Sequence, residues 1–197
     1  MSGLLIAFEG LDQSGKQTQA ELLRDRLKEE GRKTRLLSFP DYTTSIGEQI
    51  ARALQGELDY GPEVMQLLYI ANRYERAPDV RRWIDGGLVL ICDRYTASSI
   101  AYGEAQGLDP AWLREIQKFL PPPALTIMLD IAPNTAARRK LIDRERYERD
   151  LAMLSRVRAS YRRQAAAGDW VTLDGERSKE AIAADAFTAV ARQLARP

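Results

Sequence analysis

Histidine is absent from this 197-residue chain. Its absence excludes the commonest zinc ligand, the commonest general base and every nucleophile that depends on an imidazole, such as a Ser-His-Asp arrangement. The single cysteine, Cys92, excludes a disulfide framework, and its place inside the apolar run LVLIC favours a buried, inert thiol over a nucleophile. Any chemistry must therefore be done without imidazole, and the cysteine usage suits a reducing compartment.

A strong net charge and long apolar runs are also missing. The chain has 29 basic and 28 acidic side chains, so no overall field attracts nucleic acid or an anionic membrane, and anion binding must be local. No apolar run approaches the roughly 18 residues of a membrane span. The start, MSGLLIAFEG, lacks the basic region and cleavage site of a signal peptide. We expect a cytoplasmic protein with neither nucleic acid nor a membrane as partner.

Short apolar runs alternate with longer segments of helical period. The length favours one domain over residues 1–197. Because runs such as LLIAF and LVLIC are apolar throughout, we expect both faces of their sheet to be covered. The alternation predicts an α/β fold with a parallel sheet of about five strands and helices on both faces. The predicted strands are 4–8, 34–39, 88–92, 124–131 and 170–173.

The first predicted strand runs into GLDQSGKQT, which has the GxxxxGK frame of a phosphate-binding loop. In that frame backbone N–H groups surround phosphates at the start of a helix, and the lysine reaches the β- and γ-phosphates. The motif predicts a three-layer P-loop NTPase-type fold. The expected nucleotide-binding residues of the loop are Gly10, Leu11, Asp12, Gln13, Ser14, Gly15, Lys16, Gln17 and Thr18.

The loop departs from its usual form at Gln17, where a Ser or Thr hydroxyl normally ligates Mg²⁺. A glutamine oxygen can still ligate a hard cation or orient a metal-bound water. Metal binding then depends more on carboxylates, and Asp93 is the leading candidate because it follows an apolar strand at the ligand-binding edge of the sheet. An N-cap of the next helix is the alternative role for Asp93. Arg94 beside it brings positive charge to an acceptor phosphate.

Five segments in this order, FEGLDQSGKQTQ, FPDYTTSIG, LLYIANR, DRYTASSIAYGEA and ERYE, resemble those of thymidylate kinases over Phe8 to Glu148. The resemblance implies transfer of the γ-phosphoryl group of ATP to dTMP, giving dTDP and ADP in dTTP biosynthesis. It also implies Mg²⁺ as cofactor and a homodimer formed through helices near 46–84 and 96–105.

The resemblance assigns the acceptor contacts. Tyr69 stacks on thymine, Arg73 lies near the base edge or the phosphate, Asp12 bonds the sugar 3′-hydroxyl, and Tyr102 fills the space of a ribose 2′-hydroxyl. Pro40, Arg94 and Ser98 complete the expected substrate site, with Ser99 nearby. From periodicity alone, a place in the helix core explains Tyr69 better than stacking does, and Tyr102 is explained equally well as a core aromatic.

Two arginines common in such proteins are replaced here, by Gln13 in the loop and by Tyr42 in FPDYTT. The resemblance places a helical lid at about 134–150, with Arg138, Arg139, Lys140, Arg144 and Arg146 in it. We expect Arg146 to act in the transition state and Arg139 to stack on adenine. The expected catalytic residues are Lys16, Asp93, Arg94 and Arg146.

Two other functions compete with this interpretation. A deoxynucleoside kinase must activate a neutral hydroxyl, and Glu9 is the only option for its base. A nucleotide-dependent switch protein needs no acceptor pocket, which leaves LLYIANR and DRYTASSIAY unexplained. A dTMP kinase needs no base, because its acceptor is already an anion.

Overall fold

The computed structural model describes residues 3–139 and 151–195. Strands and helices alternate as the sequence predicts, and each of the five apolar runs is a strand. In chain order the elements are β1 (Leu4–Gly10), α1 (Lys16–Glu29), β2 (Thr34–Ser38), α2 (Ser45–Leu54), α3 (Pro62–Asp85), β3 (Val89–Asp93), α4 (Thr96–Ala105), α5 (Pro110–Glu115), β4 (Leu125–Asp130), α6 (Pro133–Arg139), α7 (Leu151–Ala167), β5 (Val171–Asp174) and α8 (Lys179–Leu194).

The strands form one sheet in the order β2-β3-β1-β4-β5, and each neighbouring pair is parallel. β1 lies in the centre, with Phe8 in register with Asp93 of β3 and Gly10 in register with Leu129 of β4. Ser38, the last residue of β2, is also in register with Asp93. The carboxyl ends of the three strands therefore meet at one edge, which confirms the predicted parallel sheet.

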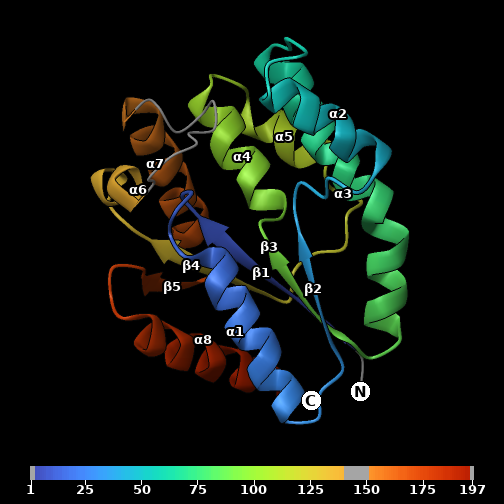
Figure 1. Ribbon diagram of the computed structural model, residues 1–197, viewed down its shortest axis with the longest axis vertical. Coiled ribbons are helices and arrows are strands. Elements are labelled where there is room, and N and C mark those ends of the chain that lie inside the picture. The colour runs from blue at the N-terminus through green and yellow to red at the C-terminus, as the bar shows by residue number, and fades with distance from the viewer. Residues whose placement is uncertain (1–2, 140–150, 196–197) are drawn as a thin grey trace.

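Helices cover both faces of this sheet (Figure 1). On one face, Ile6 and Phe8 pack with Leu23 of α1 and Ile182 of α8. The alternate strand residues, such as Leu5, pack on the other face in the cluster that includes α3. Because successive strand residues point to opposite faces, burial on both faces explains why the runs are apolar throughout. The prediction of a three-layer α/β fold is confirmed.

The structure also bears on two predictions about single regions, the buried cysteine and the lid. Cys92 is buried in β3, and burial raises the pKa of its thiol, in line with an inert side chain. Residues 134–139 of the predicted lid belong to α6, and 140–150 lie outside the described residues. Among the helices of the described residues, none is long and apolar enough to cross a membrane.

Candidate active site

The loop between β1 and α1 depends on two glycines. Gly10 has a φ of 137°, and a Cβ atom there would lie 2.4 Å from the carbonyl oxygen of Leu129. Gly15, with a φ of 93°, is the N-cap of α1 and adds no side-chain cap. The first N–H groups of α1 are therefore left for another acceptor, which is the usual basis of anion binding at a helix N-terminus.

Lys16 opens α1, and its side chain is buried. Its ammonium group donates to the carbonyl oxygen of Leu11 at 2.7 Å and to the hydroxyl of Ser14 at 3.5 Å. The charge thus lies inside the loop that the sequence identifies as a phosphate-binding loop. A buried cation at the N-terminus of a helix suits a polyanion.

Asp93 ends β3, at the edge where β1 and β2 also end. Its Oδ1 atom is buried without a hydrogen-bond partner in the described part of the chain. Burial raises the pKa of Asp93, and the nearby Lys16 opposes that rise. An unpaired, buried carboxylate oxygen needs a cation or a donor, so Asp93 fits a hard metal ion such as Mg²⁺.

Gln17 lines the same cavity as Asp93. Its amide nitrogen donates to Glu21 at 3.0 Å. Within residues 3–139 and 151–195, no three Asp, Glu or Cys side chains gather as a metal site. Mg²⁺ usually keeps several waters and takes only one or two carboxylates with substrate phosphates, so this sparse donor set still fits it.

A cavity of about 400 Å³ lies at this edge of the sheet. It brings together residues that the sequence predicts for both substrates, together with others that were not expected. The predicted residues in its lining are Asp12, Gln17, Pro40, Tyr69, Arg73, Asp93, Arg94, Ser98 and Tyr102. Ser99, expected near Ser98, and Tyr42, at the place of a replaced arginine, line it too, and the residues that were not expected are Ser38, Phe39, Leu54 and Gln66. Ser38 and Phe39 follow from their place at the end of β2, whereas Leu54 and Gln66 carry no chemical signal in the sequence.

Arg73 is a buried cation in this lining. Its Nη1 atom donates to the hydroxyl of Ser99 at 2.7 Å and to the carbonyl oxygen of Tyr69 at 3.1 Å. Its Nε atom is buried without a hydrogen-bond partner among the described residues. Burial lowers the pKa of Arg73, yet an arginine stays charged at neutral pH. An acceptor group on a ligand would satisfy this Nε–H donor.

Arg94 connects the loop after β1 with α4. Its φ is 64°, a left-handed conformation that costs about 1–3 kcal/mol for a residue other than glycine. The guanidinium forms an ion pair with Asp12. It also donates to the hydroxyls of Ser98 at 3.1 Å, Tyr161 at 3.3 Å and Tyr102 at 3.3 Å. This strained, heavily bonded arginine is characteristic of a functional site.

Tyr69 and Tyr102 both pack in the hydrophobic core and line the cavity. Tyr69 is half-buried and packs on the cluster of Ile50, Ala53 and Met65. Tyr102 is buried, and its hydroxyl donates to Asp12 at 3.2 Å. Both rings line the cavity. Core packing therefore does not compete with a place in the site.

Arg139 ends α6 and reaches the β1–α1 loop. Its guanidinium donates to the carbonyl oxygen of Gln13 at 3.2 Å and to that of Gly175 at 3.1 Å. The side chain therefore bridges the β1–α1 loop and the segment after β5. Arg146, the expected transition-state arginine, lies outside the described residues, as do Lys140 and Arg144.

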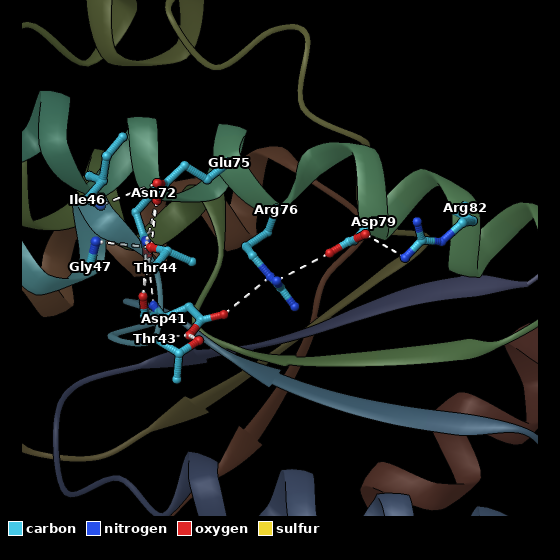
Figure 2. A network of polar contacts seen from close by, with 10 residues as sticks. All are labelled: Asp41, Thr43, Thr44, Ile46, Gly47, Asn72, Glu75, Arg76, Asp79 and Arg82. Atoms are coloured by element: carbon cyan, nitrogen blue, oxygen red, sulfur yellow. Dashed lines mark hydrogen bonds and ion pairs between the residues drawn. The ribbon is translucent and has the colours of Figure 1, made fainter.

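The segment after β2 is fastened to α3 by a polar network (Figure 2). Asn72, which is buried, accepts a hydrogen bond from the backbone N–H of Asp41 at 2.8 Å. Its amide nitrogen donates to the carbonyl oxygen of Asp41 at 3.1 Å and to the hydroxyl of Thr44 at 2.8 Å. One side chain thus satisfies both backbone groups of Asp41.

Further members of α3 hold the same segment. Glu75 accepts from Thr44 at 2.6 Å, and Arg76 forms an ion pair with Asp41 at 3.2 Å. Pro40 and Tyr42 flank Asp41 and line the cavity. The network therefore fixes their part of the cavity relative to α3, and none of its polar contacts was predicted from the sequence.

Comparison with known proteins agrees with this geometry. The thymidylate kinase family model matches residues 8–186. Thymidylate kinase from Schizosaccharomyces pombe is 38% identical over 186 residues, covering 91% of this chain and 88% of the relative. Human thymidylate kinase is 31% identical over 93% of this chain and 87% of its own. The solved thymidylate kinase from Candida albicans superposes with a TM-score of 0.86 at 28% identity, covering 98% of this chain and 93% of that one. The chain belongs to the thymidylate kinase family.

Proposed function

We propose that this protein is a dTMP kinase, which transfers the γ-phosphoryl group of ATP to dTMP and yields dTDP and ADP for dTTP biosynthesis. The observation that carries the proposal is the single cavity described above. It joins Asp12 and Gln17 of the β1–α1 loop and the carboxylate of Asp93 to Tyr69 and Arg73 of α3. A donor side and an acceptor side thus meet at one edge of the sheet.

The acceptor side binds dTMP through a ring and charges. Tyr69 offers a flat surface for thymine, and Arg73 faces the base edge or the phosphate with an unpaired donor. Arg94 supplies charge to the acceptor phosphate. Stacking and guanidinium contacts suit a flat polar base that carries a phosphate.

Asp12 and Tyr102 select deoxyribose at the sugar end of the same cavity. Asp12 accepts from the 3′-hydroxyl, and the ring of Tyr102 occupies the space that a 2′-hydroxyl would need. The hydrogen bond between the two side chains, 3.2 Å long, supports a shared task. Pro40 and Ser98 complete the lining around the substrate.

The donor side binds ATP through the loop from Gly10 to Thr18, with Lys16 at the β- and γ-phosphates. Asp93 and Gln17 would hold Mg²⁺, which supplies neutralisation of the charge on the transferring phosphoryl group. The loop itself lacks an arginine because position 13 is Gln13. Arg146 is proposed to supply that charge, and Arg139 to stack on adenine.

This chemistry needs no base from the protein, since the attacking group is a phosphate oxygen that is already ionised. Glu9, the one base that a deoxynucleoside kinase could use, is fully buried. Its two oxygens accept from the backbone of Tyr95 at 2.9 Å and from the hydroxyls of Ser98 at 2.6 Å and Tyr161 at 3.1 Å. Those bonds favour an anchoring role for Glu9.

We propose one domain over 1–197, with a helical lid at about 134–150 that closes over ATP, and a cytoplasmic location that suits the single buried thiol. We also propose a homodimer. The exposed Val64 and Leu67 on α3 lie within the region expected to form its interface.

A coupled assay of ADP release over a panel of acceptors tests the proposal. The panel contains dTMP, dUMP, dCMP, dAMP, dGMP, the ribonucleotide TMP and thymidine. The highest kcat/KM is expected with dTMP, and the ribonucleotide should be rejected. A preference for thymidine would favour the deoxynucleoside kinase, and ADP release that is independent of every acceptor would favour the switch protein.

A further inference from the structure

Tyr161 of α7 is a fully buried residue whose hydroxyl reaches the acceptor side of the site. Its ring packs in the cluster that contains Tyr102 and Met128. Its hydroxyl lies 2.8 Å from the hydroxyl of Ser98 and 3.3 Å from Nη1 of Arg94. Through these two contacts Tyr161 connects α7 with the acceptor side of the site.

The hydroxyl of Tyr161 links a buried anion with a cation of the site. It donates to Oε2 of Glu9 at 3.1 Å, and it accepts from Arg94. A hydroxyl has one hydrogen and two lone pairs, so it can serve both charged groups at once. Burial raises the pKa of Tyr161, which keeps the phenol protonated for this donation.

Ser98 forms a second link of the same kind. Its hydroxyl donates to Glu9 at 2.6 Å and accepts from Arg94 at 3.1 Å. Glu9 is itself fixed by the backbone N–H groups of Tyr95 and Ser98, at 2.9 and 3.3 Å. The guanidinium of Arg94 is therefore oriented by two hydroxyls that share one immobile carboxylate. Hydrogen bonds of this kind, with one charged partner, are among the stronger ones in proteins.

We propose that Tyr161 is a positioning residue for dTMP binding, whose hydroxyl links the Arg94 guanidinium to Glu9 and so connects the acceptor site with α7. The inference rests on the proposed function only through the assignment of Arg94 to the acceptor phosphate. It adds a residue from α7 to an acceptor site otherwise formed by the segments after β1, β2 and β3.

The variant Tyr161→Phe removes one oxygen and keeps the buried ring. We expect kcat/KM for dTMP to fall about 10-fold, the size typical of a lost hydrogen bond to a charged group. Most of the change should appear in KM for dTMP, while KM for ATP stays within about 2-fold. The reason is that Arg94 is assigned to dTMP, so a less rigid guanidinium weakens the binding of dTMP more than that of ATP.

Tyr95→Phe is the matched control. Tyr95 is as deeply buried as Tyr161 and lies next to Arg94 in the chain, but its hydroxyl donates to the carbonyl oxygen of Pro121 at 3.0 Å. Its loss should lower thermal stability about as much as Tyr161→Phe does and leave both KM values within about 2-fold. Equal kinetic losses in the two variants, or a Tyr161→Phe protein that does not fold, would assign Tyr161 a purely structural role.

A double-mutant cycle with Arg94→Ala decides whether Tyr161 acts through Arg94, with the Kd for dTMP measured by calorimetry so that turnover is not needed. Arg94→Ala should weaken dTMP binding, and Tyr161→Phe in that background should then change Kd by less than about 2-fold. An undiminished 10-fold effect there overturns the proposal. If Arg94→Ala alone leaves Kd unchanged, the assignment of Arg94 fails, and if the wild-type protein does not phosphorylate dTMP, the proposed function fails.

Discussion

Asp12 and Arg94 form an ion pair that joins the β1–α1 loop to the residue that follows β3. The carboxylate of Asp12 also accepts from the hydroxyl of Tyr102, which in turn accepts from Arg94. These three side chains therefore form a closed set of contacts along one wall of the cavity. In the proposed function they hold the sugar and the phosphate of one nucleotide, so their mutual bonds prepare the acceptor site before dTMP enters.

Stacking on the base is tested by Tyr69→Ala. Loss of a base–aromatic contact costs about 1–3 kcal/mol, so KM for dTMP should rise between about 5- and 150-fold with a smaller change in kcat. Tyr69→Phe, which keeps the ring, should remain close to wild type. Steady-state kinetics with each substrate varied separately measures both. A rise in KM for ATP instead would place Tyr69 on the donor side.

The variant Asp93→Asn should lose activity and gain stability. The rate of phosphoryl transfer should fall by about 10²-fold or more, because the carboxylate proposed to hold Mg²⁺ is lost. Burial raises the pKa of Asp93, so its ionised form costs folding free energy at neutral pH. The variant should therefore be more stable than wild type at pH 7.

The gain in stability of Asp93→Asn over the wild type should decrease as the pH falls. As the pH falls from the raised pKa of folded Asp93 towards about 4, the ordinary aspartate value, the wild-type carboxyl becomes protonated and the difference between the two proteins shrinks. Urea unfolding at pH 7 and pH 5, without Mg²⁺ and nucleotide, measures it. A variant that is less stable than wild type at pH 7 contradicts this explanation of the buried Oδ1 atom.

The network between the segment after β2 and α3 is tested by Asn72→Ala. The change leaves the backbone groups of Asp41 without their partner, so the free energy of unfolding should fall by about 1–3 kcal/mol. KM for dTMP should rise because Pro40 and Tyr42 lose their support. Arg82→Ala is the control, since Arg82 forms an exposed ion pair with Asp79 at the far end of the network (Figure 2). It should change stability by less than about 0.5 kcal/mol.

Because the phosphate-binding loop has Gln13 in place of an arginine, the roles of the lid arginines can be tested. Arg146→Ala should lower kcat by about 10³-fold and weaken ATP binding far less, as is typical of arginines that act in the transition state. Gln13→Arg should recover part of that loss. Arg139→Ala should mainly raise KM for ATP. The division of roles is wrong if Arg146→Ala costs little turnover and Gln13→Arg restores nothing.

The fold could be predicted from the sequence because its strands are buried on both faces and appear as short apolar runs. The order β2-β3-β1-β4-β5 could not, since no local signal states which strands become neighbours. Glycine spacing and strand ends also indicated Lys16 and Asp93, whose chemistry is recognisable in the chain itself. The family resemblance contributed Tyr69 and Tyr102.

Residues that act by position escaped prediction. Asn72 and Tyr161 reach Asp41 and Arg94 only through tertiary packing, and their side chains carry no catalytic signature. Gln66 and Leu54 line the cavity for the same reason. Such contacts depend on how α2, α3 and α7 pack against the sheet edge, which the periodicity of each helix does not specify.

The identity of the phosphorylated product tests the central claim most directly. The wild-type protein is incubated with dTMP, Mg²⁺ and ATP labelled in the γ-phosphate, and the nucleotides are separated by chromatography. The variant Lys16→Ala is assayed in parallel, with Lys28→Ala, which changes an exposed lysine of the same helix, as the control. The label should appear in the β-phosphate of dTDP with wild type and Lys28→Ala, and its rate should fall by orders of magnitude with Lys16→Ala. Label that is released only as inorganic phosphate, or transferred to thymidine and not to dTMP, would contradict the account.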